Sequence, residues 1–300
     1  MLPALIGLIA VLSLITDGLL TRSNLIGVFS QSAVVAIAAI GATFVILTGG
    51  IDLSVGSVIG ASGLAGAWVI TTTGNIALGV AAGLAAGSVI GLVVGVVVAR
   101  LGVVPFAATL AALYVVSGGA TLLSHGNTIA PVPDGFINFS IDGPGGVPSA
   151  VWLAVVLFIA AQLVLTGTAW GRRVLLVGAN REVARISGVN VARTTTSVYA
   201  VAGLFSALAG MVLTSELAGA GASMGSPLLL SIVGAVVLGG TSLFGGRGSL
   251  LRTGIGVVFL GFLSNGMSLL GLADYDQQMV TGAMIFLAAS GDGLFHRPRS

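Results

Sequence analysis

The chain has 300 residues, of which 56% are hydrophobic and only 7% charged, with a formal net charge of +2. A soluble domain carries roughly 25% charged residues, so this chain lacks the polar side chains needed to cover a water-facing surface. It contains no cysteine and no lysine, which excludes a disulfide framework, a thiolate metal site and a lysine-dependent phosphate loop. These properties predict an integral membrane protein.

Ten apolar segments are candidates for membrane-spanning helices, each of which needs roughly 20 apolar residues to cross the hydrocarbon core. A barrel is not expected, because the segments do not alternate apolar and polar side chains, and helices are the other way to satisfy every backbone group in lipid. We therefore predict a single all-α transmembrane domain over residues 1–300. The segments are 3–20, 25–48, 53–73, 76–99, 104–124, 150–167, 195–215, 227–242, 251–272 and 277–291.

The arginines predict the orientation of the bundle, because the cytoplasmic loops of membrane proteins are enriched in basic residues. If all ten segments span and both termini are cytoplasmic, Arg22 is the one arginine that lies outside. The other ten then lie inside: Arg100, Arg172, Arg173, Arg181, Arg185, Arg193, Arg247, Arg252, Arg297 and Arg299. This bias predicts two cytoplasmic termini.

Two connections between the segments are long. Residues 125–149 form an outer loop rich in proline and glycine, and residues 168–194 form the only extended cytoplasmic loop, which is basic. We expect the cytoplasmic loop to meet a partner protein.

The segment 76–99 carries five glycines at a strict spacing of four residues. Such a stripe lets another helix approach closely within a membrane. Close packing inside the bundle is the simpler interpretation, and a conformationally soft seam in a moving transporter is the alternative. The glycines are Gly79, Gly83, Gly87, Gly91 and Gly95.

The sequence offers no catalytic or metal-binding motif. Gly240 and Gly245 have the spacing of the two glycines of a phosphate loop, but Gly246 and Arg247 stand where that loop needs its lysine and its hydroxyl residue. The histidines, His125 and His296, have no second ligand at helical spacing. We therefore expect no enzyme activity and no cofactor in this chain. An intramembrane enzyme remains a distant alternative.

Three separated strings carry a resemblance to a known family. They are T-G-G-I-D-L-S-V-G-S at 48–57, V-G-A-N-R-E-V-A-R-I-S-G-V at 177–189 and A-V-V-L-G-G-T-S-L-F-G-G-R-G-S at 235–249. In these strings, and in their order, the chain resembles the permease subunits of bacterial ABC sugar importers of the ribose/xylose/arabinose type. It departs from that pattern at Leu228 and Leu230, where the family commonly has acidic residues.

The resemblance implies a multi-pass permease of the bacterial inner membrane that imports a monosaccharide-like solute. It implies three partners: ABC ATPase subunits that bind ATP and magnesium, a periplasmic sugar-binding protein, and a second permease copy or paralogue. The chain itself would hold no cofactor.

The resemblance and local signals together predict a short coupling helix over residues 181–186. Asn180 is a good N-cap and Gly188 a plausible C′ residue. Ala184 is small enough to let the helix enter a cleft of a partner. The alternative is a basic amphipathic helix that lies along the lipid headgroups. The predicted coupling residues are Gly178, Asn180, Arg181, Glu182, Ala184, Arg185 and Gly188.

The predicted gate or pathway residues are Gly49, Gly50, Asp52 and Ser54. After a helix break at the two glycines, Asp52 is expected to be an N-cap that accepts the N–H groups of residues 54 and 55. A carboxylate that binds sugar hydroxyls and a proton-coupling acid are the alternatives.

A second glycine-rich segment is predicted to form a cytoplasmic turn. Residues 235–243 repeat the shape of residues 45–53, with Ser242 in the capping place of Asp52, which hints at an internal duplication. The glycines of the turn are Gly239, Gly240, Gly245, Gly246 and Gly248.

The nature of the solute stays open at this point. A related permease could carry a nucleoside, a branched-chain amino acid or a furanosyl signal molecule. An ion-coupled secondary transporter would show buried carboxylates within its spans, and the near-absence of charge there argues against it.

Overall fold

The computed structural model describes residues 1–295, so His296, Arg297 and Arg299 lie outside the described residues. Within this range every regular element is a helix, and two residues, Ile129 and Ala220, form an isolated β-bridge. The elements are α1 (Leu2–Ile15), α2 (Arg22–Leu47), α3 (Val55–Thr73), α4 (Ile76–Arg100), α5 (Pro105–Leu123), α6 (Asp134–Ile141), η1 (Pro144–Gly146), α7 (Ser149–Gly167), α8 (Ala169–Ala179), α9 (Arg181–Ile186), α10 (Val191–Glu216), η2 (Ser226–Leu228), α11 (Leu229–Leu238), α12 (Leu250–Leu269) and α13 (Asp274–Phe295).

Seven of the described helices are long and apolar enough to cross a membrane: α2, α3, α4, α5, α7, α10 and α12. Each matches one of the ten expected segments. The other three segments correspond to α1, α11 and α13. With 14 and 10 residues, α1 and α11 rise about 21 and 15 Å, less than the roughly 30 Å of a hydrocarbon core. The all-helical class is confirmed, and the count of ten spans stays a prediction.

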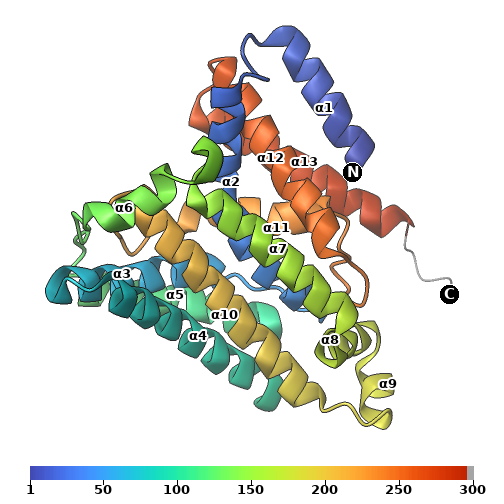
Figure 1. Cartoon of the computed structure of the whole chain (residues 1–300). Helices are drawn as coiled ribbons and strands as arrows, with labels where there is room; N and C mark the ends of the chain where they lie inside the picture. The colour runs from blue at the N-terminus through green and yellow to red at the C-terminus, as the bar shows by residue number, and fades with distance from the viewer. Residues whose placement is uncertain (296–300) are drawn as a thin grey trace.

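The centre of the bundle consists of α2 and α10, which are the two longest helices and are mostly buried. α10 packs against α4 and α3 on one side and against α2 on the other. In Figure 1, α10 runs diagonally across the molecule between α4 and α7. Helices at the two ends of the chain, α1, α12 and α13, lie together at the opposite edge from α3 and α4.

The glycine stripe of α4 lies on the faces of α3 and α10. A β carbon at Gly83 would lie 2.8 Å from the Ser62 carbonyl oxygen, and one at Gly87 would lie 2.7 Å from that of Gly203. All five stripe glycines are buried. The predicted close packing is therefore confirmed, because no larger side chain leaves room for these backbones.

The expected outer loop contains a helix that the sequence analysis did not predict. The Ser140 hydroxyl of α6 bonds to that of Ser215 on α10 at 2.8 Å, and Ser215 donates to the Phe136 carbonyl at 2.6 Å. At the same end, the Arg22 guanidinium donates to the Gly145 carbonyl at 2.7 Å. These bonds hold the outer segment on the ends of α2 and α10.

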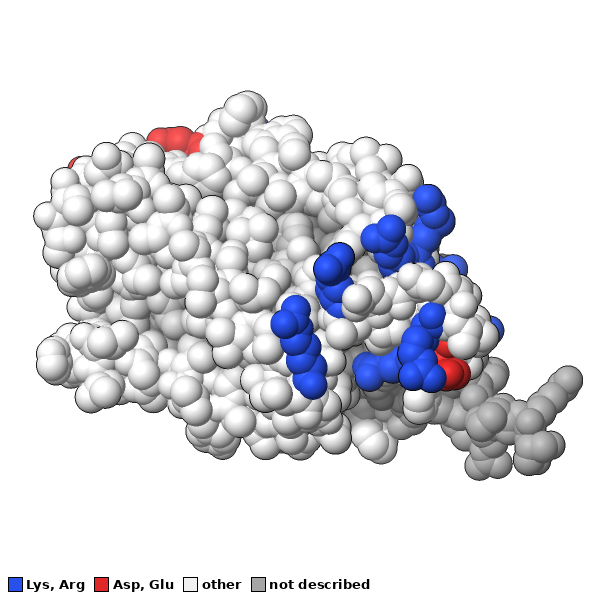
Figure 2. Space-filling view, turned by 90° about the horizontal axis from the view of Figure 1, so that it is seen from below, with Lys and Arg blue, Asp and Glu red and all other residues white. Residues whose placement is uncertain are grey.

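The arginines gather at the other end. Without Arg297 and Arg299, eight of the ten expected inner arginines remain in the described part, in or beside α4, α8, α9, α10 and α12. Figure 2 shows basic side chains grouped on one side of a face that carries almost no other charge. This distribution agrees with the predicted orientation, in which that end faces the cytoplasm.

Candidate functional site

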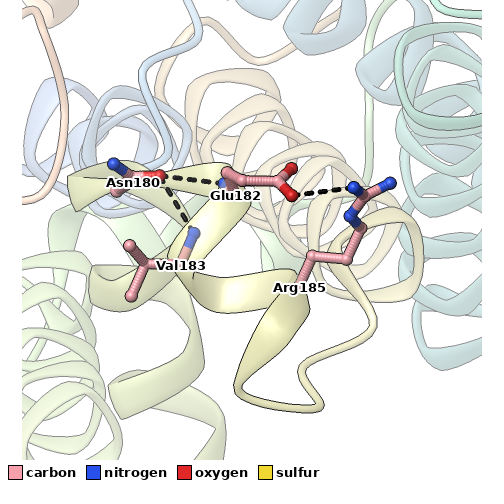
Figure 3. Close-up of polar contacts among 4 residues, drawn as sticks. All are labelled: Asn180, Glu182, Val183 and Arg185. Carbon is pink, nitrogen blue, oxygen red and sulfur yellow. Dashed lines mark hydrogen bonds and ion pairs between the residues drawn. The ribbon is translucent and has the colours of Figure 1, made fainter.

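The short helix α9 forms where the sequence predicts it, and both of its ends are capped. The Asn180 side-chain oxygen accepts the N–H groups of Glu182 at 2.9 Å and Val183 at 3.0 Å (Figure 3). At the other end Gly188 has a φ of +79°, and its N–H bonds to the Arg185 carbonyl at 3.0 Å. The Val189 N–H donates to the Ala184 carbonyl at 3.0 Å, which completes a Schellman motif.

α9 has a buried face and an exposed face. Ala184 is fully buried against the rest of this chain, where α9 packs on α8 and α10. Its small side chain lets α9 lie close to its own bundle. That the helix enters a cleft of a partner stays a prediction, for which the opposite face of α9 is available. Glu182 and Arg185 form an exposed ion pair of 2.7 Å (Figure 3), and Ile186 is 75% exposed. The exposed face thus combines charge with an apolar side chain.

The three strings of the resemblance meet at the end of α2. The Gly246 N–H donates to the Leu47 carbonyl at 2.9 Å. The Cα of Gly178, at the end of α8, lies so close that a β carbon there would overlap the Leu47 carbonyl oxygen and lie 2.6 Å from the Gly246 nitrogen. We call these contacting segments, 47–49, 178–179 and 244–246, the backbone junction.

The other glycines of the backbone junction are equally constrained. A β carbon at Gly245, which has a φ of +87°, would lie 2.7 Å from the Gly49 nitrogen. One at Gly246 would lie 2.6 Å from the Cα of Ala179. The sequence indicates each glycine separately but not that they touch. α9 begins at Arg181, directly after Ala179 and the N-cap Asn180. The end of α2 therefore contacts the segment that leads into α9, and backbone atoms alone make this contact.

The glycine-rich turn occupies the connection between α11 and α12, as predicted. Gly240 has a φ of +79° and ends α11. A β carbon at Gly239 would lie 2.6 Å from the Arg252 carbonyl oxygen, and one at Gly248 would lie 2.6 Å from the Thr241 side chain. The turn is therefore packed tightly against the start of α12.

Asp52 follows the predicted break but is not an N-cap. Its Oδ1 accepts the Ser54 N–H at 2.8 Å and the Ser54 hydroxyl, and Ser54 itself occupies the cap position of α3. Residue 55 makes no bond to it. The carboxylate thus closes a local turn two residues before the helix, and at 8% exposure it is buried. The break is confirmed, since α2 ends at Leu47 and Gly49, the residue after its C-cap, has a φ of +74°.

The suspected duplication has a structural counterpart, displaced by one residue. The residue after the C-cap is Gly49 for α2 and Gly240 for α11, both with positive φ, whereas the aligned strings pair Gly49 with Gly239. Ser242 accepts the N–H of residue 244 at 3.3 Å, as Asp52 accepts that of residue 54. Ser242 does not cap a helix, because α12 starts only at residue 250.

Leu228 and Leu230, at the expected acidic positions, lie at the start of α11. Leu228 is partly buried against the core, and Leu230 is 68% exposed. A carboxylate at residue 230 would meet no steric obstacle. Nothing in the structure explains the replacement.

Comparison with known proteins places these features in a family. The family model described as "Branched-chain amino acid transport system / permease component" matches residues 24–289. The chain is 40% identical over 298 residues to the ribose import permease protein RbsC of Escherichia coli K12, covering 97% of this chain and 92% of that protein. It is 39% identical to RbsC of Bacillus subtilis 168, covering 94% and 88%. It is 36% identical to the L-arabinose transport system permease protein AraH of Escherichia coli K12, covering 90% and 82%. No solved structure matches the chain.

Proposed function

The chain belongs to the family of branched-chain amino acid transport system permease components, and on that premise we propose that it carries a monosaccharide-like solute across the bacterial inner membrane. It is a transport subunit of the membrane and not an enzyme. The choice of solute rests on one observation: the chain matches permeases named for ribose and arabinose over most of its own length and most of theirs. The solute proposed here is a pentose or a similar monosaccharide.

We infer that ATP hydrolysis is supplied by separate ABC ATPase subunits that bind α9. The helix is short, is capped at both ends and presents exposed Arg181, Arg185 and Ile186 to the cytoplasm. Its inner face is anchored by Ala184. A rigid, outward-facing helix of this kind can transmit a displacement instead of deforming. ATP and magnesium belong to the ATPase in this proposal, and the permease holds no cofactor.

Two further partners complete the proposed importer. A periplasmic binding protein delivers the sugar to the end of the bundle that carries α6 and the Arg22–Gly145 contact. A second permease copy or paralogue lies beside this chain in the membrane. The lipid-facing surfaces of α5 and α7 are extensive enough for such a neighbour, since both helices are mostly exposed in the single chain.

The backbone junction supports a role for the Gly49–Ser54 segment as the inner gate. It connects α2 to α3, and Gly178, shortly before α9 in the chain, packs on Leu47 at the end of α2. A displacement of α9 therefore acts first on the end of α2. Asp52, bonded to Ser54, gives the segment a defined turn, and the gate opens or closes by moving that turn.

Reconstitution tests this function. The tagged permease is purified with its co-expressed ATPase and binding protein and placed in proteoliposomes, and the uptake of labelled ribose, arabinose and xylose is measured with ATP inside or outside. We expect uptake of at least one pentose that depends on ATP and on the binding protein. Uptake of a nucleoside or an amino acid alone would contradict the proposed solute. Ion-driven uptake by the permease alone would contradict the whole proposal.

A further inference from the structure

The hydroxyl of Tyr199 is a buried polar group that the proposed function does not yet use. Tyr199 lies in α10 near its cytoplasmic end, and its side chain is 1% exposed. Within residues 1–295 its oxygen has no hydrogen-bond partner. Burying an unpaired hydroxyl is unfavourable, so such a group needs an explanation. A phenylalanine would fill the same space without this penalty.

Four buried polar atoms of the described chain have no hydrogen-bond partner. They are Gln162 Oε1, Thr195 Oγ1, Tyr199 Oη and Thr241 Oγ1. Other buried hydroxyls are satisfied: Thr43, Ser62 and Thr214 each donate to a carbonyl one turn back in their own helix. The unpaired Tyr199 hydroxyl is therefore an exception among the buried hydroxyls of the bundle.

Tyr199 points at the predicted gate segment. A β carbon at Gly50 would lie 2.6 Å from the Tyr199 oxygen, so residue 50 must be glycine for the hydroxyl to stay where it is. Asp52 follows two residues later in the same segment. Within the described residues, Asp52 uses Oδ1 for both of its hydrogen bonds and Oδ2 for none. The Tyr199 hydroxyl, which has no acceptor, therefore lies beside the Gly49–Ser54 segment, in which Asp52 Oδ2 accepts no hydrogen bond.

We propose that Tyr199 is a positioning residue of the inner gate and that its hydroxyl bonds to the Asp52 carboxylate in a second conformation of the transport cycle. The proposal rests on the proposed function, because it assigns the second conformation to the movement that α9 imposes on the end of α2. A hydrogen bond to a carboxylate is roughly twice as strong as a neutral one, so it stabilises the displaced segment selectively. Gly49 and Gly50 allow the required backbone rotation.

The first test is Tyr199→Phe in the complete importer, with sugar uptake, ATP hydrolysis and thermal stability measured together. We expect the complex to assemble with an unchanged or higher melting temperature, because the variant removes an unpaired buried group. Uptake per ATP hydrolysed should fall at least about fivefold, the effect of losing one hydrogen bond in the second conformation. The matched control is Tyr114→Phe on α5, where the side chain is 70% exposed, which should change neither quantity.

Two results would overturn the inference. A lower melting temperature for Tyr199→Phe would mean that the hydroxyl is already bonded in the resting state, for example to a buried water. Unchanged uptake per ATP would mean that the hydroxyl has no role in coupling. If the unsubstituted importer transports no sugar, the proposed function fails instead, so the two failures are distinguishable.

A second pair of variants checks the contact itself. Gly50→Ala introduces a methyl group that meets the Tyr199 oxygen, so we expect poor assembly. Adding Tyr199→Phe removes that oxygen, and the next neighbour of the new methyl group is Val45 at 3.1 Å, a side chain that can shift. The double variant should recover assembly and melting temperature but not coupled uptake. Recovery of full coupled uptake, or no recovery of assembly, would contradict the proposed arrangement.

Discussion

The Cα of Gly178 lies directly against the carbonyl oxygen of Leu47, with no side chain between α8 and the end of α2. The same carbonyl accepts the Gly246 N–H at 2.9 Å, so one buried helix end receives both contacts. A carbonyl at a helix C-terminus has no partner within its helix. The contacts therefore satisfy that orphan group and join the loop that carries α9 to the helix break before Asp52.

Gly178→Ala should weaken this connection strongly. The added methyl group overlaps the Leu47 carbonyl oxygen, and overpacking of this kind costs about 1–3 kcal/mol. We expect a lower melting temperature of the purified permease and reduced uptake. The control is Gly118→Ala on α5, where a β carbon would have no neighbour within 4 Å. Equal melting temperatures for the two variants would contradict the tight packing.

Gly188→Val should uncouple ATP hydrolysis from uptake while the importer still assembles. Gly188 has a φ of +79°, a conformation that costs a branched side chain roughly 1–2 kcal/mol, so the end of α9 should lose its Schellman motif. ATP hydrolysis and uptake are measured on the same proteoliposomes. Gly188→Asn is the matched control, because asparagine tolerates positive φ, and it should retain most coupling. Normal uptake by Gly188→Val would exclude α9 as the coupling helix.

Asp52→Asn should retain more of the uptake than Asp52→Ala. The amide oxygen of asparagine can still accept the Ser54 N–H, and its NH₂ group can still bond to a hydroxyl. Alanine leaves the Ser54 donors without their acceptor, at a cost of about 1–3 kcal/mol. Uptake is measured for both variants across a range of pH. If Asp52 carried protons, Asp52→Asn would abolish uptake, which would support the proton-coupling alternative.

Gly87→Val should prevent α4 from packing on α10. A β carbon there would lie 2.5 Å from the Ala207 side chain and 2.7 Å from the Gly203 carbonyl oxygen, and valine adds two more methyl groups. We expect little folded protein in detergent extracts, judged by size-exclusion chromatography. Gly119→Val, on the open surface of α5, should behave as the unsubstituted chain in the same experiment. A well-folded Gly87→Val permease would show that α4 tolerates a wider spacing.

The long helices were predictable because hydropathy and length are properties of a contiguous segment. The seven spans, the break after Leu47 and the caps of α9 at Asn180 and Gly188 all follow from neighbours in the chain. α6 was missed because the prolines and glycines that surround it obscure an eight-residue helix. α8 was missed because residues 168–179 are less apolar than the spans.

The membrane class, the family and the orientation expected from the arginines could be predicted, because each depends on composition or on local strings. The folded chain was needed to show that Leu47, Gly178 and Gly246 touch, that Ala184 faces its own bundle, and that the Tyr199 hydroxyl lies against Gly50. The contacts of Leu47 with Gly178 and Gly246, and that of Tyr199 with Gly50, join segments more than 60 residues apart along the chain. No local pattern specifies such a contact, since it depends on how helices pack and on which of their residues lack side chains.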